Sequence, residues 1–173
     1  MDTSQLIKDA FISLYSKTDY NKITVKALCE AVPIARTTFY SHYQNIDEIK
    51  SELERETIEG IRSACEDIYS GDTEKYFSLA LKYIEEHREI FFAFLVAQPN
   101  WRFISKFKNA IIIHFKDNFK DKIRSKNYEL ELEIFASGVV SFYTYILKHP
   151  DEVDVKALGK KFSMLVKFVD VIF

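Results

Sequence analysis

The stretch that decides the fold is TVKALCEAVPIARTTFYSHYQN, residues 24–45. Its spacing predicts two short helices over about 24–32 and 35–43, separated by a turn at Pro33, because proline cannot continue a helix. Thr24 is of the residue type that caps a helix N-terminus. Two helices joined by a turn of about four residues are typical of a helix-turn-helix, whose second helix fits the major groove of DNA.

The second helix of this unit separates an apolar face from a polar one. Phe39 and Tyr43 point inward, and the opposite face lacks Asp and Glu. We expect a solvated surface of this protein to carry acids, as SELERE (51–56) does. We therefore interpret the outward face as a candidate DNA-reading surface, and the alternative is an ordinary polar surface helix. Its side chains are Arg36, Thr37, Thr38, Tyr40, Ser41 and His42.

Composition and charge limit the possible functions. With 173 residues, 47% of them hydrophobic and 29% charged, the chain has the composition of a folded globular protein. The net charge of −2 argues against bulk affinity for nucleic acid. Residues 1–50 hold six cationic and six anionic side chains, so any DNA contact must come from the placement of charges rather than from their sum.

Helical spacing continues along the rest of the chain. A long helix is predicted over about 47–69, and its apolar face changes direction between Leu53 and Ile58, as in a helix that serves two cores. Gly60 inside it lowers its rigidity. Further helices are predicted over 3–17, 73–87, 88–97, 101–123, 128–148 and 152–172.

The predicted fold is therefore all-α, with about nine helices. An N-terminal three-helix domain over residues 1–46 carries the helix-turn-helix. A larger helical domain follows over residues 47–173.

Five elements around the turn carry a family resemblance: Ile23-Thr24-Val25, Ala27-Leu28-Cys29-Glu30, Arg36, Thr38-Phe39-Tyr40 and His42-Tyr43. In this order they resemble the N-terminal signature of the tetracycline-repressor (TetR) family of bacterial transcription regulators. The similarity covers residues 6 to about 50. The resemblance implies a homodimer that binds a double-stranded DNA operator and a small-molecule effector, which its C-terminal domain would hold.

The resemblance also implies roles for individual residues. Thr24 and Lys26 would approach the DNA, and Tyr40 and His42 would touch its backbone. Arg36, Thr37 and Thr38 would face base edges and adjoining phosphates, and Ser41 would face the groove. Arg36 is the strongest candidate for reading a base edge, and the alternative is that it holds a phosphate. The predicted DNA-contacting residues are Thr24, Lys26, Arg36, Thr37, Thr38, Tyr40, Ser41 and His42.

Three residues depart from the family pattern. Pro33 stands where the turn usually has Gly, Ala35 where Ser or Thr usually caps the helix, and Ile46 where Lys is frequent. A lost cap costs ~1 kcal/mol, and one missing cation lowers the salt dependence by about one charge. These departures predict weaker operator binding on an unchanged fold.

Aromatic residues concentrate in the second domain. At helical spacing the plain interpretation is that these rings form the core, but large rings between helices also leave room for a ligand. Trp101, Phe103 and Phe107 are our candidate walls of the effector site.

The C-terminal region, about 128–172, is predicted to form the dimer interface. It contains the small residues of 136–138 and an apolar stripe that runs from Val155 to Ile172. The alternative is that this stripe packs within one subunit.

Other functions find little support in the sequence. The four histidines are scattered, no Gly-rich phosphate loop is present, and we expect no enzyme activity, cofactor or metal. We expect no signal peptide or membrane span, and reduced thiols at Cys29 and Cys65 indicate the cytoplasm. The sequence favours a ligand-responsive repressor. The alternatives are a co-regulator or ligand sensor that acts through a protein partner, and an unregulated small-molecule binding protein.

Overall fold

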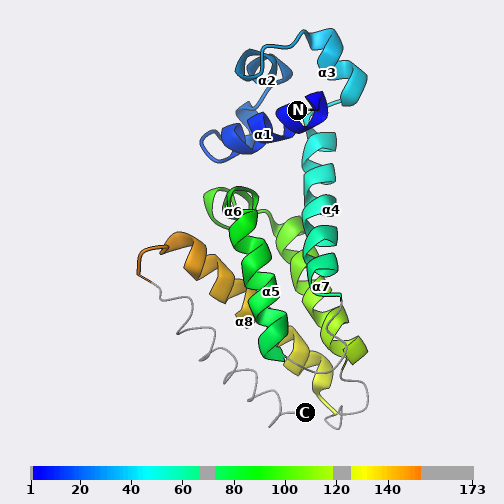
Figure 1. Cartoon of the computed structure of the whole chain (residues 1–173), viewed down its shortest axis with the longest axis vertical. Coiled ribbons are helices and arrows are strands. Elements are labelled where there is room, and N and C mark those ends of the chain that lie inside the picture. Colours follow the sequence, from blue (N-terminus) through cyan, green and yellow to red (C-terminus); the bar gives the residue numbers. More distant parts are fainter. Residues whose placement is uncertain (1, 67–72, 119–125, 153–173) are drawn as a thin grey trace.

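The computed structural model describes residues 2–66, 73–118 and 126–152, and within these ranges all regular structure is helical. Figure 1 shows three short helices at one end, the head, from which one long helix runs into a body of four further α-helices. The predicted all-α class is confirmed for the described residues.

The head contains three α-helices and one short 3₁₀ turn. Its core is made by rings and branched side chains from all three helices, with Phe11 and Phe39 completely buried. The predicted inward positions of Phe39 and Tyr43 are confirmed. The elements are α1 (Thr3–Tyr15), η1 (Tyr20–Lys22), α2 (Val25–Ala31) and α3 (Arg36–His42).

The long helix α4 (Ile46–Ala64) joins the head to the body. Its first turn is held by two hydrogen bonds that resemble those of a capping box. Asn45 Oδ1 accepts the N–H of Glu48 at 3.0 Å, and the Glu48 carboxylate accepts the N–H of Gln44 at 2.6 Å.

The predicted change of direction along α4 is wrong. Its buried residues Ile49, Leu53, Thr57 and Ile61 lie four positions apart and form one stripe. Thr57 is buried because its hydroxyl donates to the carbonyl of Leu53 at 2.7 Å. The stripe joins one continuous core that runs from the head into the body, instead of the two cores we expected.

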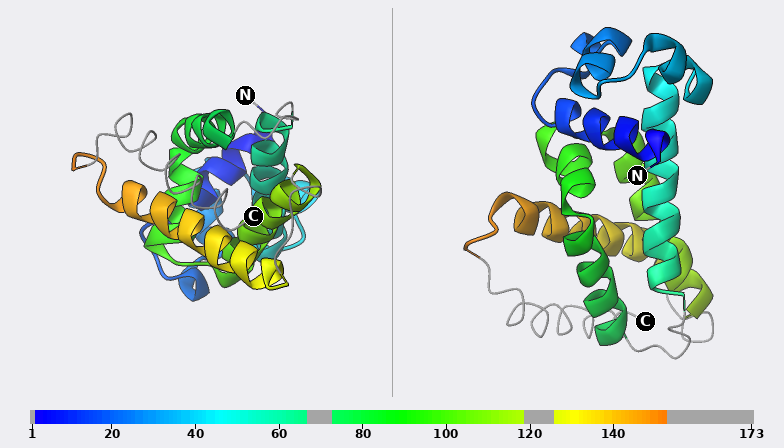
Figure 2. Two further views of the ribbon diagram at one scale, coloured as in Figure 1. Left: turned by 90° about the horizontal axis from the view of Figure 1, so that it is seen from below. Right: turned by 45° about the horizontal axis from the view of Figure 1, so that its top comes forward.

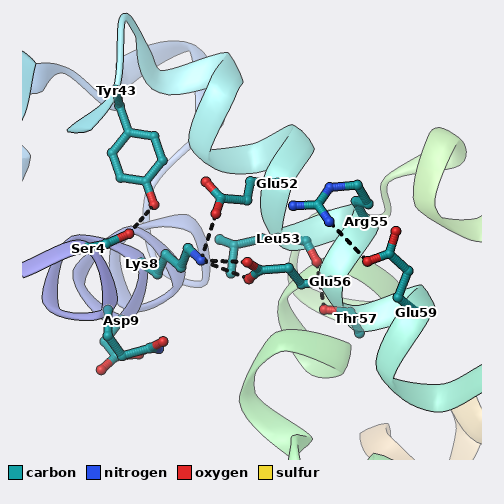
Figure 3. A network of polar contacts seen from close by, with 11 residues as sticks. Ser4, Lys8, Asp9, Tyr43, Glu52, Leu53, Arg55, Glu56, Thr57 and Glu59 are labelled. Atoms are coloured by element: carbon teal, nitrogen blue, oxygen red, sulfur yellow. Dashed lines mark hydrogen bonds and ion pairs between the residues drawn. The ribbon is translucent and has the colours of Figure 1, made fainter. Parts of the chain in front are cut away.

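SELERE (51–56) also differs from the prediction that it forms a solvated acidic face. Glu54 is only 1% exposed. It accepts hydrogen bonds from Asn100 Nδ2 at 2.7 Å and from Lys106 Nζ at 2.8 Å. Glu52 and Glu56 point toward the head instead of into bulk water (Figure 3).

The body is packed around aromatic rings. Phe103 lies against Phe91 and Phe94, and Phe107 lies against Phe91 and Tyr143, with ring centroids 5.1–6.1 Å apart. Seen from below in Figure 2, α8 crosses in front of the other body helices. The elements are α5 (Thr73–Glu86), α6 (Arg88–Phe92), a π-helical turn η2 (Ala93–Ala97), α7 (Trp101–Asn118) and α8 (Tyr128–Lys148).

The predicted helix over 88–97 is thus divided between α6 and η2. The predicted helix over 152–172, with the stripe from Val155 to Ile172, lies outside the described residues. By length and hydropathy, α8 is the one described helix that could cross a membrane. This is weak evidence, because core helices have the same properties and α8 packs on α7.

Gly60 has a different role from the one predicted. A Cβ at this position would lie 1.9 Å from the hydroxyl oxygen of Tyr83. The absent side chain therefore makes room for the ring of Tyr83, which stacks on His87 with centroids 4.0 Å apart.

Candidate nucleic-acid interface

Buried rings fix the position of α3 on the head. Phe39 lies in the core, and the ring of Tyr43 lies beside it at a tilt of 45°, with centroids 6.2 Å apart. The hydroxyls of Tyr43 and Ser4 are hydrogen-bonded at 2.7 Å, which ties the end of α3 to the start of α1 (Figure 3). The turn before α3 is tight, since the N–H of Ile34 bonds to the carbonyl of Val32 at 2.6 Å.

The opposite side of α3 faces solvent. Tyr40 is 57% exposed, with its ring edge against Phe39. The Ser41 hydroxyl donates to the Thr38 carbonyl at 2.7 Å, so its lone pairs stay available as acceptors. Of the eight predicted contact residues, Thr38 is half-buried and the other seven are exposed: Thr24, Lys26, Arg36, Thr37, Tyr40, Ser41 and His42.

Charges on this surface suit an anionic partner. Arg36 makes no hydrogen bond or ion pair with any residue that the structure describes. Lys26 lies 3.8 Å from Glu30, and both side chains are exposed. An exposed pair of this kind contributes little stability, so a phosphate can replace Glu30 as the partner of Lys26. Thr24 Oγ1 caps α2 by accepting the N–H of Ala27 at 3.1 Å, as predicted.

A charged clasp, formed by Lys8, Glu52 and Glu56, holds the head on α4 (Figure 3). Lys8 Nζ lies 2.8 Å from both carboxylate oxygens of Glu56 and 2.9 Å from Glu52, and its side chain is 9% exposed. Burial alone lowers the pKa of Lys8, but the hydrogen bonds to the two carboxylates outweigh it and raise the pKa. Burial likewise acts to raise the pKa of Glu52, and Lys8 lowers it overall. Lys8 and Glu52 therefore hold each other in the charged form.

An amide bridge, made by Gln98 and the backbone of the head, forms a second junction. Gln98 Nε2 donates to the carbonyl of Tyr15 and, at 2.7 Å, to that of Thr18. Its Oε1 accepts the N–H of Tyr20 at 2.9 Å. Gln98 thus satisfies three backbone groups where α1 ends. Beside it, the ring of Tyr15 meets Phe94 edge-on at 5.3 Å.

Asn100 extends this junction to α4 and α7. Its Oδ1 accepts the N–H groups of Arg102 at 3.1 Å and Phe103 at 3.3 Å, which caps α7. Its Nδ2 donates to the buried Glu54 of α4. We did not predict the clasp or the amide bridge. The sequence signal for the cap of α7 was Asn100, an Asn that follows Pro99 and precedes a helix. The signal for the clasp was the pair of acids Glu52 and Glu56, four residues apart on α4.

Comparisons with known proteins agree on the fold. No model of a known protein family matches the chain. A TetR transcriptional regulator from Streptococcus agalactiae 2603V has a TM-score of 0.71 at 23% identity, over 95% of this chain and 93% of that one. The fatty acid degradation regulator FadR from Bacillus halodurans has a TM-score of 0.68 at 15% identity, over 94% of this chain and 93% of that one. This chain has the TetR fold.

One curated relative is similar in sequence. The HTH-type dhaKLM operon transcriptional activator DhaS of Lactococcus lactis is 26% identical over 121 residues. The match covers 70% of this chain and 60% of that protein. A solved structure of a dihydroxyacetone kinase operon activator DhaS has a TM-score of 0.65 at 20% identity, over 98% of this chain and 94% of that one.

The three departures from the TetR pattern lie beside the candidate surface, in the turn before α3 and at the start of α4. Pro33 and Ala35 are exposed, and Ala35 begins α3 without a side-chain cap. Ile46 begins α4 and is followed by Asp47 and Glu48, which favour a helix N-terminus but repel a phosphate there. The fold tolerates all three changes. Their effect on operator binding stays a prediction.

Of the three candidate ligand-wall residues, Phe103 and Phe107 lie together, with ring centroids 6.1 Å apart, and Trp101 lies apart from them on the surface. Trp101 is 75% exposed, because it lies on the outer face of the first turn of α7. Phe103 is sealed in the core between Phe91 and Phe94. Of the three, Phe107 lines a cavity of about 400 Å³ between α4, α5 and α7.

Proposed function

We propose that this protein is a sequence-specific DNA-binding transcriptional regulator that acts in the cytoplasm as a homodimer and responds to a small-molecule effector. The observation that carries the proposal is the exposed face of α3. It bears hydrogen-bonding side chains and no acid, and it belongs to a helix-turn-helix. The TetR fold and the DhaS relative, itself named a transcriptional activator, support the same function.

Arg36 has the leading role in this proposal. Its guanidinium is exposed and lacks an intramolecular partner among the described residues, so it can reach a guanine edge or a phosphate. Thr37 and Ser41 present hydroxyls beside it, and Tyr40 and His42 are placed to contact the backbone. Thr24 and Lys26 of α2 would bind the adjoining phosphates.

A homodimer is proposed because one head reads only one half-site. Two recognition helices must lie ~34–36 Å apart to enter successive major grooves. The outer face of α8 supports this assembly. It carries exposed apolar residues and a glycine at which an added Cβ would meet no atom within 4 Å. The residues of this face are Leu130, Ile134, Ser137, Gly138, Ser141 and Tyr145.

We propose that α4 transmits the effector signal. The C-terminal half of α4 borders the cavity of the body, and its N-terminal half carries the clasp to the head. A ligand that tilts α4 would change the distance between the two heads of a dimer. Repression is the simpler outcome, since a dimer on an operator blocks transcription without a further partner. An activator, as DhaS is named, needs a contact with a further partner.

Gel-shift measurements with fragments of the host genome test the proposal. We expect a sequence-preferring shift at low salt, weakened about 10- to 100-fold by Arg36→Ala, because one bidentate base contact is worth ~1–3 kcal/mol. Arg102→Ala, an exposed arginine on α7, is the matched control and should bind like the wild type. Light scattering should find the same dimer for both variants. An intact protein without any sequence-preferring shift would favour a co-regulator that acts through a protein partner.

A reporter gene under the recovered operator then tells repression from activation. The same gel shift, repeated with a library of small molecules, tests the response to an effector. DNA affinity that no bound compound changes would refute the ligand-responsive part of the proposal.

A further inference from the structure

The recognition helix α3 depends on its surroundings for a fixed position. It has only seven residues, Arg36–His42, and a helix of this length is not stable by itself in water. Among the described residues, no side chain caps its start at Ala35. The ring of Phe39 holds the middle of α3 in the core. Apolar packing is non-directional, so this contact alone does not fix the tilt of the helix.

A pair of hydroxyls supplies a directional contact at the other end of α3. Tyr43, the residue that ends the helix, is only 3% exposed, and its hydroxyl lies 2.7 Å from Oγ of Ser4. Ser4 is half-buried in the first turn of α1. A hydrogen bond weakens steeply when it is misaligned, so this pair fixes where the end of α3 lies relative to α1. Burial raises the pKa of Tyr43, so its hydroxyl keeps its proton at physiological pH.

The next turn of α1 is bound to α4. Lys8 follows Ser4 by four positions, so the two side chains lie on the same side of α1. In Figure 3 one contact joins Tyr43 to Ser4, and one turn along α1 further contacts join Lys8 to the two glutamates of the clasp. Helix α1 thus holds the end of α3 with one turn and α4 with the next. A shift of α4 can therefore reach the recognition helix through α1.

We infer that Tyr43 is a positioning residue for operator reading: its bond to Ser4 holds α3 at the tilt at which Arg36 meets a base edge. Contacts to base edges need such alignment, whereas long side chains can follow a phosphate through a small shift. Loss of the bond should therefore weaken binding to the operator more than binding to unrelated DNA. This inference rests on the function proposed above, and it adds a buried residue that does not itself touch DNA.

Two variants remove the bond from opposite sides. Tyr43→Phe and Ser4→Ala each lack one hydroxyl, and we expect each to weaken operator binding about 3- to 10-fold, the worth of one hydrogen bond. Binding to an unrelated duplex of the same length should change by less than about twofold, because it depends on charge. The double variant should bind no more weakly than either single variant, because both substitutions remove the same bond. Fluorescence anisotropy with labelled duplexes measures these affinities, at a temperature at which circular dichroism shows every variant folded.

Ser16→Ala is the matched control on the same helix. Ser16 is half-buried, and its hydroxyl donates to the carbonyl of Ile12 at 2.9 Å, so this variant loses a bond that stays within α1. It should bind the operator like the wild type. Ser4→Thr keeps a hydroxyl beside Tyr43 and should also bind like the wild type.

Hydrogen exchange of the free protein tests the position of α3 without DNA. The amides of α3 should exchange about 3- to 10-fold faster in Tyr43→Phe, because the end of the helix opens more often. The amides of α2 should keep their wild-type rates, and Ser16→Ala should leave α3 unchanged.

Three results would overturn the inference: wild-type operator binding by Tyr43→Phe, equal losses on the operator and the unrelated duplex, or unchanged exchange of α3. Operator binding as weak in Ser16→Ala as in Ser4→Ala would also overturn it, because only the stability of α1 would then matter. A wild-type protein that shifts no DNA would refute the proposed function. Faster exchange of α3 in Tyr43→Phe would in that case still show that Tyr43 positions this helix.

Discussion

Two of the junctions that hold the head on the rest of the molecule differ in chemistry. The charged clasp joins α1 to α4 through Lys8, Glu52 and Glu56. The amide bridge joins the end of α1 to the segment after η2, through Gln98 and three backbone groups. One junction is ionic and partly exposed, and the other is neutral and directional.

This difference indicates which junction can move. An ammonium attracts carboxylates from many directions, so Lys8 can follow Glu52 and Glu56 through a small shift of α4. An amide that serves two carbonyls and one N–H tolerates little displacement, because hydrogen bonds weaken steeply when misaligned. We therefore expect the head to pivot at the amide bridge and to slide at the clasp.

The largest effect should come from Gln98→Ala. It leaves two carbonyls and one N–H without partners at a half-buried site, and we expect the free energy of unfolding to fall by about 2–3 kcal/mol. Urea unfolding measures this loss. Hydrogen exchange should locate it, with faster exchange of the Tyr20 amide. Gln98→Glu keeps an oxygen that accepts the N–H of Tyr20, so the exchange of this amide should stay slow. The glutamate cannot donate to the carbonyls of Tyr15 and Thr18.

Gln44→Ala, at an exposed glutamine of the head, is the control and should change stability by less than about 0.5 kcal/mol. If Gln98→Ala were as mild as this control, the amide bridge would not be the fixed point of the head.

A smaller loss, about 1–2 kcal/mol, is expected for Lys8→Met, because a broken ion pair leaves carboxylates without a partner. The loss is moderated by solvent, since the side chains of Glu52 and Glu56 are 30% and 41% exposed. Denaturation at ~1 M salt should reduce the difference between Lys8→Met and the wild type, because salt screens exposed charges. The loss in Gln98→Ala should not depend on salt.

The two junctions should also respond differently to pH. The pKa of Glu52 is lowered in the folded state, so its contribution is present above the unfolded value of about 4.3 and is lost as pH falls below it. The pKa of Lys8 is raised, so its contribution is present below about 10.4 and is lost as pH rises through the folded value. The difference between Lys8→Met and the wild type should therefore be constant near neutral pH and shrink in acid. The Gln98→Ala difference should stay constant, and a parallel decline in both would contradict the comparison.

Local signals in the sequence predicted the parts of the molecule that depend on near neighbours. The cap at Thr24 is formed with a residue three positions away, and the inward rings of α3 follow from helical spacing. The class of fold and the exposed face of α3 follow from the same periodicity.

The junctions depend on partners that are distant in the chain, and no local pattern contains them. Glu56 meets Lys8 across 48 positions, and Gln98 meets Tyr20 across 78. An acid in a helical sequence looks the same whether water or a lysine faces it, which is why SELERE was misinterpreted. Thr57 was overlooked because a buried hydroxyl that bonds its own helix does not differ in sequence from an exposed one. Trp101 was proposed as a wall of the effector site, but an aromatic residue in a helical sequence looks the same whether its ring faces the core or, as here, the solvent.

The smallest effect, and the finest test of the comparison, is expected at Gly60. Gly60→Ala gains about 1 kcal/mol of helix propensity but pushes on Tyr83, whose pKa is raised by burial and further by the nearby carboxylate of Glu56. We expect a net change within about 1 kcal/mol, because the two terms oppose each other. In double-mutant cycles, Gly60→Ala should couple to Lys8→Met by about 0.5 kcal/mol or more and add independently to Gln98→Ala. Coupling to Gln98→Ala instead would mean that the two junctions form one rigid unit. The head could then not slide at the clasp.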